Sequence, residues 1–391
     1  MKADSRPHRV IPYGTQEISD ADVAAVTDAL RDPLLTQGPR VAEFEDRLAS
    51  TVGARHAVAF NSGTAALHGA YFAVGLQPGR SVVTSPITFV ATANASLYLG
   101  GTVRFADIDP ATVLVDPRAV ASTEHRDVQV LAPVHFGGQV ADMAELERIA
   151  RQRDWKIVED AAHALGATYR VRGHEYQVGA CAHSDACCFS FHPVKHITTG
   201  EGGAVTTNDE AVYRKLLRFR THGITRDASE LLSNDGAWYY EQHDLGFNYR
   251  ITDFQCALGM SQLERLRDSV ARRRALAACY DRLFADRASI RALAVPAWSS
   301  GAYHLYVVRV PSDARRRIFD AMRQARIGVN VHYIPVYRHP YYRAHGFART
   351  RLPHAEAYYA EAMSIPMFPG LTEAELDFVV RELCRLTEGE R

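Results

Sequence analysis

The chain has 391 residues, of which 47% are hydrophobic and 23% are charged, values close to those of average soluble globular proteins. Its 45 Lys and Arg residues balance 45 Asp and Glu residues, so it lacks the surplus positive charge that nucleic-acid and anionic-membrane binders usually carry. The composition therefore argues against a disordered or fibrous protein, and the length favours two or three domains. We expect neither a nucleic-acid partner nor a membrane partner.

The start of the chain is polar from Met1 to Pro12 and contains no apolar segment of signal-peptide length. No uninterrupted apolar run elsewhere approaches the ~20 residues that cross a bilayer. These features predict a cytoplasmic protein. None of the six cysteines has the C-x-x-C spacing of zinc or redox sites, so we expect free and mostly buried thiols. They are Cys181, Cys187, Cys188, Cys256, Cys279 and Cys384.

Short apolar runs alternate with longer segments of helical periodicity along the first part of the chain. The expected strands are residues 56–60, 81–84, 102–105, 128–134 and 155–158. The expected helices are residues 64–74, residues 143–153 with Asp142 as N-cap, and residues 210–220 after Asp209. This alternation predicts an α/β protein with a mainly parallel sheet between layers of helices.

A long amphipathic segment from residue 253 to about residue 285 predicts one helix that leads into a second domain. A strand at 304–310 and helices at 313–325 and 372–386 follow it. We therefore expect a large domain over residues 1–258 with an N-terminal arm, and a smaller C-terminal α/β domain over residues 259–391.

The segment Asn61-Ser62-Gly63-Thr64 stands between an expected strand and an expected helix. Small residues at a helix start leave backbone N–H groups open to a phosphate, and the helix dipole favours an anion there. An ordinary turn in which Ser62 or Thr64 caps the helix is the alternative interpretation.

An apolar strand ends in Asp160, and His163 follows three positions later. Ligands of open α/β sheets gather at the carboxyl ends of the strands, so Asp160 is placed to reach a bound cofactor. A carboxylate that merely caps a helix is the alternative at this position.

Lys195 lies in a Thr- and Gly-rich loop between two apolar strands, within residues 189–205. Burial there would lower its pKa and make it a nucleophilic amine, whereas an isolated loop lysine is ordinarily a solvated charge. The three segments together suit pyridoxal 5′-phosphate, which needs a lysine for its aldehyde, an acid for its ring nitrogen and a dipolar cradle for its phosphate.

The chain resembles the DegT/DnrJ/EryC1/StrS family of sugar aminotransferases over nearly its whole length. Besides the lysine segment, the resemblance is carried by Leu35-Thr36-Gln37-Gly38, by residues 86–94, by Gly246-Phe247-Asn248-Tyr249-Arg250 and by residues 331–335. It implies the aspartate-aminotransferase-like fold, called fold type I, with pyridoxal phosphate as the cofactor.

The resemblance also implies roles for individual residues. Lys195 would bond the cofactor aldehyde and act as the catalytic base, with Asp160 facing the pyridine nitrogen as the second catalytic residue. His163 would contact the phenolic oxygen, and Phe89 would stack on the ring.

The phosphate ligands that the resemblance implies are Gly63, Thr64 and Ser190, with Asn248 reaching across from a second subunit. Arg250 is a rival for the contact assigned to Asn248. A homodimer with shared active sites is therefore expected, and no metal is.

The substrates implied by the resemblance are L-glutamate and a UDP-linked 4-keto-6-deoxy-N-acetylhexosamine, aminated at C4 in pseudaminic acid biosynthesis. The expected product is UDP-4-amino-4,6-dideoxy-N-acetyl-β-L-altrosamine. His192 favours this UDP-sugar branch, because relatives that make GDP-perosamine carry Tyr there. The residues expected to line the sugar-nucleotide cleft are Tyr13, Pro33, Leu34, Leu35, Thr36, Asn330, Val331, His332 and Tyr333.

Several alternatives remain at this point. Tyr13 and Tyr333 could serve only in packing. Nucleotide-linked sugars of the perosamine, bacillosamine or 4-amino-arabinose type could replace the expected substrate. A pyridoxal-phosphate-dependent dehydratase is disfavoured because Lys195 stands where such relatives carry His. A non-catalytic regulator is disfavoured because the sequence shows no appended DNA-binding module. The pair His192 and His196 has zinc-protease spacing but lacks the glutamate of H-E-x-x-H.

Overall fold

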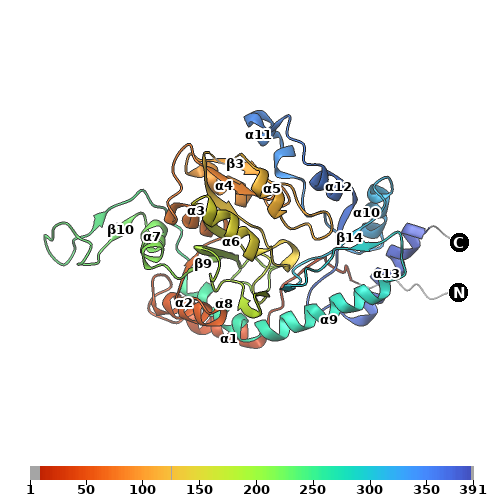
Figure 1. Cartoon of the computed structure of the whole chain (residues 1–391). Coiled ribbons are helices and arrows are strands. Elements are labelled where there is room, and N and C mark those ends of the chain that lie inside the picture. The colour runs from red at the N-terminus through yellow and green to blue at the C-terminus, as the bar shows by residue number, and fades with distance from the viewer. Residues whose placement is uncertain (1–8, 125, 389–391) are drawn as a thin grey trace.

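The structure is a computed structural model that describes residues 9–124 and 126–388. A large body surrounds a central sheet, and the long helix α9, Leu266–Phe284, leads from it into a smaller body (Figure 1). The polar residues 1–8, part of the segment used above to predict a cytoplasmic location, lie outside the described residues.

The central sheet has seven strands in the order β1-β9-β8-β5-β4-β2-β3. β9 runs antiparallel to both of its neighbours, and the remaining pairings are parallel. The carboxyl ends of all strands except β9 therefore meet at one edge, where ligands bind in open α/β sheets. The strands are β1 His56–Phe60, β2 Ser81–Thr84, β3 Thr102–Phe105, β4 Val128–Ala132, β5 Lys156–Asp160, β8 Ala186–Ser190 and β9 Gly203–Thr207.

Helices cover both faces of this sheet. On one face, α3 (Gly63–Ala73) contacts α4 (Ala91–Tyr98) and α7 (Glu210–Arg220). On the other face, α2 (Pro39–Val52) packs on α8 (Asp253–Glu264), and α6 (Met143–Gln152) contributes to the same core. This three-layer arrangement, mainly parallel at its centre, confirms the predicted α/β fold class.

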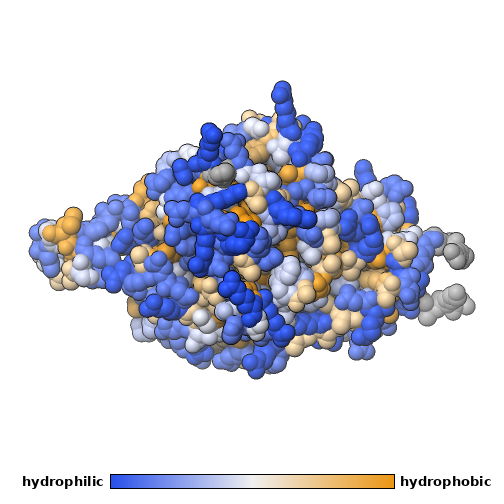
Figure 2. All heavy atoms as spheres, in the orientation of Figure 1, coloured by the Kyte–Doolittle hydropathy of each residue, from blue (hydrophilic) through white to orange (hydrophobic). Residues whose placement is uncertain are grey.

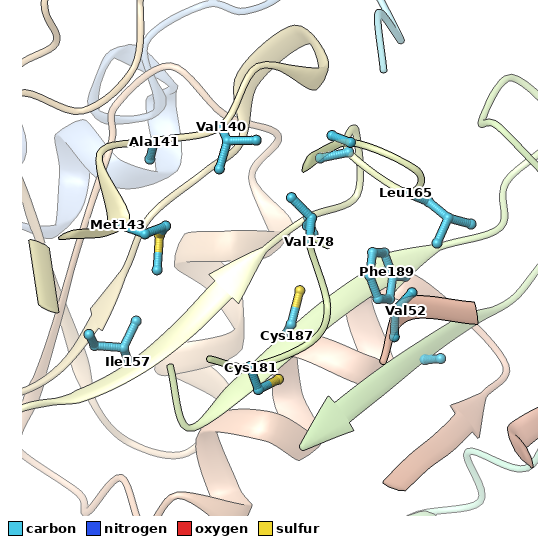
Figure 3. Packing of buried hydrophobic residues seen from close by; sticks show 14 of the residues in the cluster. Val52, Val140, Ala141, Met143, Ile157, Leu165, Val178, Cys181, Cys187 and Phe189 are labelled. Carbon is cyan, nitrogen blue, oxygen red and sulfur yellow. The ribbon is translucent and has the colours of Figure 1, made fainter. Parts of the chain in front are cut away.

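Two separate apolar cores follow from the alternation of side chains along each strand. Ile157 and Cys187 belong to the cluster shared with α2 and α6, part of which Figure 3 shows. Their neighbours Val158 and Cys188 belong to the cluster shared with α3 and α7. Cys187 and Cys188 therefore point to opposite faces, and all six cysteines are free, as predicted.

The predicted elements agree closely with the structure. The strands predicted at 56–60, 81–84 and 102–105 have these bounds, and Asp142 and Asp209 cap their helices as expected. β4 ends before the predicted residue 134 because Pro133 has no N–H to continue the ladder.

One element differs from the prediction. The single helix expected from residue 253 to about residue 285 is broken at Arg265, whose φ of −102° and ψ of 2° are not helical. No Gly or Pro marks this break. The Arg265 guanidinium instead pairs with the buried Asp22 of α1, Asp20–Ala29, so a tertiary contact accompanies the break.

The smaller body has its own apolar core around a three-stranded antiparallel sheet, β12-β14-β15. Along α9, Leu266 and Val270 pack into the large body's core that includes α2 and α6. Leu276 and Tyr280 pack into the core of the smaller body. The domain division near residue 258 stays a prediction. The elements here are β12 Arg291–Ala292, β14 Tyr306–Arg309, α10 Arg315–Gln324, α12 Pro353–Glu361, β15 Ala362–Ile365 and α13 Glu373–Glu388.

A hairpin of β10, Ile224–Thr225, and β11, Glu241–Gln242, projects from the large body at the left of Figure 1. In the described parts of the chain, no helix is long and apolar enough to cross a membrane. The remaining elements are α5 Pro117–Ser122, η1 Phe136–Gly138, β6 Thr168–Val171, β7 His174–Gln177, β13 Ser299–Ser300, η2 Val336–Arg338, α11 Pro340–Tyr342 and η3 Arg343–Phe347.

Candidate active site

A cavity of about 830 Å³ opens at the carboxyl ends of the parallel strands. It is lined by the large body and by residues 304, 330–334 and 339 of the smaller body. Its size fits a cofactor together with part of a substrate. The predicted site residues that line it are Tyr13, Gly63, Thr64, Phe89, Asp160, His163, Ser190, Lys195, Asn330, Val331, His332 and Tyr333.

Asp160 ends β5 and is almost fully buried in the wall of this cavity. The Thr92 hydroxyl donates to its Oδ2 at 2.6 Å, and the Ala162 N–H donates to its Oδ1 at 3.1 Å. Thr88 extends this chain, with its Oγ1 2.7 Å from Thr92 Oγ1. The carboxylate is therefore held in one orientation, in which it can accept a hydrogen bond from a cationic ring nitrogen.

The N-terminus of α3 lines the cavity. Ser62 caps the helix by accepting from the Ala65 N–H, as one sequence interpretation had it. The N–H groups of Gly63 and Thr64 carry no hydrogen bond within the described chain and remain available to an anion. A Cβ on Gly63 would come within 2.9 Å of Ser190 Cβ, so only glycine allows this close approach.

Lys195 lies between β8 and β9 with its side chain in the cavity. Burial lowers the pKa of its amine to about 8, against the opposing attraction of the Asp160 carboxylate. The amine is therefore partly neutral near physiological pH and can act as a nucleophile or a base. Its Nζ lies 3.4 Å from Nε2 of His304.

His163 stands beside Tyr333, whose hydroxyl lies 3.2 Å from His163 Nε2. The Gly137 N–H donates to the other ring nitrogen, Nδ1, at 3.3 Å, which leaves Nε2 to carry the proton of a neutral ring. Burial, with Lys195 nearby, holds the pKa of His163 well below its usual value. His163 is thus a neutral hydrogen-bonding group facing the cavity.

Phe89 is 59% exposed although it is a large aromatic residue on the cavity wall. Its ring centroid lies 6.3 Å from that of Tyr333. An exposed aromatic face inside a cavity is a surface on which a planar ring can stack.

Five predicted site residues lie outside this cavity. Residues 33–36 sit between α1 and α2, where the Leu35 carbonyl accepts from the Asp253 N–H. Asn248 bridges to Thr221 below the hairpin. The contacts predicted for residues 33–36 with the substrate, and for Asn248 with a partner's cofactor, stay predictions.

Sequence reasoning missed two residues of the site. Thr92 stood in a segment quoted for the family resemblance but carried no role of its own. His304 stood at the start of a predicted strand, and the only signal was a histidine before an apolar run. Neither spacing nor composition could bring His304 to Lys195, which lies 109 residues away in the chain.

These residues fit pyridoxal phosphate. The glycine cradle and free N–H groups at α3 suit its phosphate, the Phe89 face suits its ring, and Asp160 suits its pyridine nitrogen. Lys195 supplies the amine. By contrast, no group of three or more His, Cys, Asp or Glu side chains placed to hold a metal occurs among the described residues.

Comparison with known proteins agrees with this geometry. The model of the DegT/DnrJ/EryC1/StrS aminotransferase family matches residues 16–384. The spore coat polysaccharide biosynthesis protein SpsC of Bacillus subtilis is 37% identical over 385 residues, 97% of each chain. A UDP-4-amino-4,6-dideoxy-N-acetyl-β-L-altrosamine transaminase of Campylobacter jejuni is 34% identical over 384 residues, covering 97% of this chain and 98% of its own.

Solved structures give the same result. Helicobacter pylori PseC, described as an aminotransferase involved in the biosynthesis of pseudoaminic acid, superposes with a TM-score of 0.90 at 28% identity. That match covers 97% of this chain and all of PseC. The PLP form of the Streptococcus pneumoniae sugar aminotransferase Spr1654 superposes with a TM-score of 0.88 at 28% identity, covering 97% and 99% of the chains.

The fold and the site define a fold type I, pyridoxal-phosphate-dependent enzyme of the sugar aminotransferase class. The chain belongs to the DegT/DnrJ/EryC1/StrS aminotransferase family.

Proposed function

We propose that the enzyme moves an amino group from L-glutamate to C4 of a UDP-linked 4-keto-6-deoxy-N-acetylhexosamine. The observation that carries the aminotransfer chemistry is the buried Lys195 amine in one cavity with the Asp160 carboxylate and the open N-terminus of α3. The relatives of C. jejuni and H. pylori support the choice of substrate. The location stays the sequence-based expectation of a cytoplasmic enzyme.

Pyridoxal phosphate, when bound, supplies an aldehyde that captures amines and a ring that withdraws electrons from the bond being broken. Gly63, Thr64 and Ser190 would hold its phosphate, and Phe89 would cover one face of its ring. Asp160 would keep a proton on the ring nitrogen by charge pairing, which strengthens the withdrawal of electrons.

Lys195 then serves as the proton carrier. With a pKa lowered to about 8 by burial, its amine would accept the proton of the donor α-carbon and would return it to the carbon of the cofactor that carries the amino group. In the second half of the reaction Lys195 works in reverse and delivers a proton to C4 of the sugar. His163 donates a hydrogen bond through Nε2 without carrying charge.

The mouth of the cavity offers polar groups to a sugar. Tyr13 and Asn330 interact with each other, and burial, opposed by that interaction, raises the pKa of Tyr13. His332 Nδ1 lies 2.8 Å from the Ser364 hydroxyl, and this hydrogen bond fixes the orientation of the ring. Burial lowers the pKa of His332 to about 3, and the ring is neutral at working pH. These groups suit the hydroxyl, amide and carbonyl oxygens of the uncharged keto-sugar part of the substrate.

The substrate prediction is tested with a small panel. Enzyme, pyridoxal phosphate and L-glutamate are incubated separately with UDP-2-acetamido-2,6-dideoxy-β-L-arabino-hexos-4-ulose, its D-xylo epimer and a GDP-linked 4-keto-6-deoxymannose. We expect the first to be turned over at least about 10-fold more efficiently than the others, a difference of about 1.4 kcal/mol in transition-state binding. NMR assigns the aminated carbon. Preference for either of the other sugars contradicts the proposed substrate, while aminotransfer itself would stand.

A second part of the proposal is that two chains form a homodimer through the hairpin. We call this hairpin (residues 224–245) the arm; it is not the N-terminal arm predicted from the sequence. Its tip exposes Leu232 at 91% and Trp238 at 74%, and Figure 2 shows hydrophobic atoms there on a mostly hydrophilic outline. Exposed apolar side chains of this size favour a partner surface. Asn248, at the base of the arm, lies outside its own cavity, which supports the predicted contact across the dimer.

The arm is ordered by its own hydrogen bonds, as a fixed docking element requires. Glu241 accepts from the Leu232 and Ser233 N–H groups and from the Tyr239 hydroxyl, at 2.9 to 3.0 Å. These backbone bonds and His243 lower the pKa of Glu241 to about 2. At the base, Arg218 pairs with Asp244.

The double variant Leu232→Glu/Trp238→Glu is therefore expected to be monomeric by light scattering at concentrations where the wild type is dimeric. Two charges placed in an apolar interface remain unpaired and cost several kcal/mol. Val295→Glu, an exposed apolar position before β13, serves as the control and should stay dimeric. A double variant that remains a dimer would rule out this role of the arm.

The Thr92→Val variant tests the support of Asp160. The lost hydrogen bond to a charged group is worth about 1.5–3 kcal/mol, so we expect pyridoxal phosphate to bind about 10-fold or more weakly. Titration of the cofactor-free enzyme with pyridoxal phosphate measures this. Thr88→Val is the matched control, because the Thr88 hydroxyl touches Thr92 and not Asp160. Equal affinities of Thr92→Val and wild type would contradict the assignment.

A further inference from the structure

His304 occupies a position in the cavity that the roles above do not use. Its side chain is 4% exposed, and its Nε2 lies 3.4 Å from Nζ of Lys195. Its ring centroid lies 4.4 Å from that of His163. The other ring nitrogen, Nδ1, is buried without a hydrogen-bond partner in the described chain. His304, which belongs to the smaller body, thus contacts both Lys195 and His163 of the site.

The backbone around His304 is held tightly against the large body. The Ala302 N–H donates to the Gly138 carbonyl at 3.0 Å, and the Leu305 N–H donates to the Gly137 carbonyl. A Cβ on Gly138 would lie 2.6 Å from the Tyr303 nitrogen, so this crossing requires glycine. Tyr303 itself has a φ of +50°, a conformation unfavourable for a tyrosine. Such an outlier persists only where its surroundings enforce it.

Arg273 of α9 supplies part of that enforcement. Its side chain is 1% exposed, and its Nη1 donates to the carbonyls of Tyr303, His304 and Met367 at 3.2, 3.5 and 3.0 Å. No carboxylate pairs with it in the described residues, and burial lowers its pKa to about 10. A buried guanidinium with only carbonyl partners is costly to maintain. Its hydrogen bonds fix the strained turn that presents His304.

We propose that His304 is a positioning residue that orients the Lys195 amine, and that Arg273 fixes His304 through the backbone of residues 303 and 304. This inference rests on the role of Lys195 proposed above. A lysine amine at the end of a four-carbon chain has many rotamers, and proton transfer requires one of them. A ring nitrogen at 3.4 Å selects that rotamer without itself touching the reacting carbon.

The ring of His304 is suited to accept a hydrogen bond from the ammonium form of Lys195. Burial first, and then the charge of Lys195, holds the pKa of His304 well below its usual value, so its ring is neutral. His163, His196 and Arg273 act in the same direction. An ammonium group has donors only, and therefore a neutral Nε2 that faces it must accept. Among the residues that the structure describes, the carboxylate that acts on Lys195 is Asp160.

The first measurement is made on the full-length chain freed of cofactor. Competitive acetylation with acetic anhydride at pH 6 to 10, followed by mass spectrometry, gives the titration midpoint of each lysine. Lys215 on α7 serves as the internal reference for folding. For wild type we expect a midpoint near the value of about 8 at Lys195.

His304→Leu keeps the surroundings of Lys195 apolar and removes the hydrogen-bond acceptor for its amine. We expect its Lys195 midpoint to fall by about 1 unit, in line with the loss of a hydrogen bond to a charged group. An unchanged or higher midpoint overturns the proposal. Arg273→Leu, if folded, is expected to shift the midpoint in the same direction, and an unchanged midpoint there removes Arg273 from the proposal.

A second pair of variants keeps the test decisive if His304→Leu does not fold. A glutamine at position 304 can place a polar atom where Nε2 stands, and an asparagine is one methylene too short. We expect His304→Gln to retain the glutamate half-reaction rate within about 10-fold and His304→Asn to lose about 100-fold, with similar KM for glutamate. Equal rates for the two variants contradict a positioning role.

The failure of the proposed function would look different. Borohydride reduction of the wild-type holoenzyme should attach the cofactor to Lys195, and its attachment elsewhere would remove the basis for both proposals. Attachment at Lys195 with an unchanged midpoint in His304→Leu would overturn the inference about His304 alone.

Discussion

Replacing Lys195 with alanine is expected to lower aminotransfer by at least about 10⁴-fold, because in our proposal one side chain supplies the amine that bonds the cofactor and also carries the proton. The variant should also lose the visible absorption that lysine-bound pyridoxal phosphate shows. Absorption spectra and single-turnover assays with L-glutamate measure the two effects. A Lys195→Ala enzyme that keeps its colour and its rate would disprove the site.

The chain makes this experiment unusually clean. It contains four lysines, at positions 2, 156, 195 and 215, so a borohydride-trapped cofactor can be assigned to one of very few peptides. Lys215→Ala is the matched control, since this side chain lies on α7 and lines no part of the cavity. It should retain wild-type colour and rate. A wild type that binds pyridoxal phosphate but does not convert it with glutamate would instead favour the non-catalytic regulator.

Replacing Asp160 with asparagine is expected to lower kcat by at least about 10³-fold. The amide has nearly the same shape but carries no charge, so it cannot stabilise a protonated ring nitrogen in a buried site. The Ala162 N–H can still donate to the amide oxygen, and the Thr92 hydroxyl, which donates to Asp160, can instead accept from the amide NH2 group. The free energy of unfolding should therefore change by less than about 1 kcal/mol, measured by urea denaturation.

The adjacent residue provides a control on the same strand. Glu159 points to the other face, where its Oε2 lies 2.7 Å from Nε2 of His135 and where Ser184 donates to its other oxygen. Glu159→Gln is expected to lower the free energy of unfolding by about 1–3 kcal/mol while keeping cofactor binding. The two variants should separate stability from catalysis. A Glu159→Gln enzyme that stays stable but loses the cofactor would contradict this division of roles.

Two relatives of similar identity to this chain carry different names. The B. subtilis spore coat protein is 37% identical and the C. jejuni transaminase is 34% identical, so identity alone does not separate their functions. The catalytic roles proposed for Lys195 and Asp160, and the cofactor contact proposed for His163, would be the same for any keto sugar. We therefore expect selectivity to depend on groups such as Asn330 and Tyr13 at the cavity mouth, and on residues that a second chain would bring.

The parts of the site that were predicted have local signals. Gly63 and Lys195 follow apolar strands and Asp160 ends one, and the carboxyl ends of parallel strands share one edge. The order of the predicted strands therefore indicates that these three residues lie close together. The break at Arg265 and the crossing at Tyr303 have no such signal, because both depend on partners far away in the chain.

The amino-acid sequence by itself determined the α/β order of elements, the caps of α6 and α7, and the three segments that suit a phosphate, a ring nitrogen and an aldehyde. These features depend on periodicity and on neighbours within a few residues. Only the tertiary structure decided that His304 meets Lys195, that residues 33–36 and Asn248 lie outside the cavity of their own chain, and that the arm projects into solvent. The physical reason is that long-range packing sets such contacts. It joins groups that are distant in sequence, and no local pattern encodes their distance.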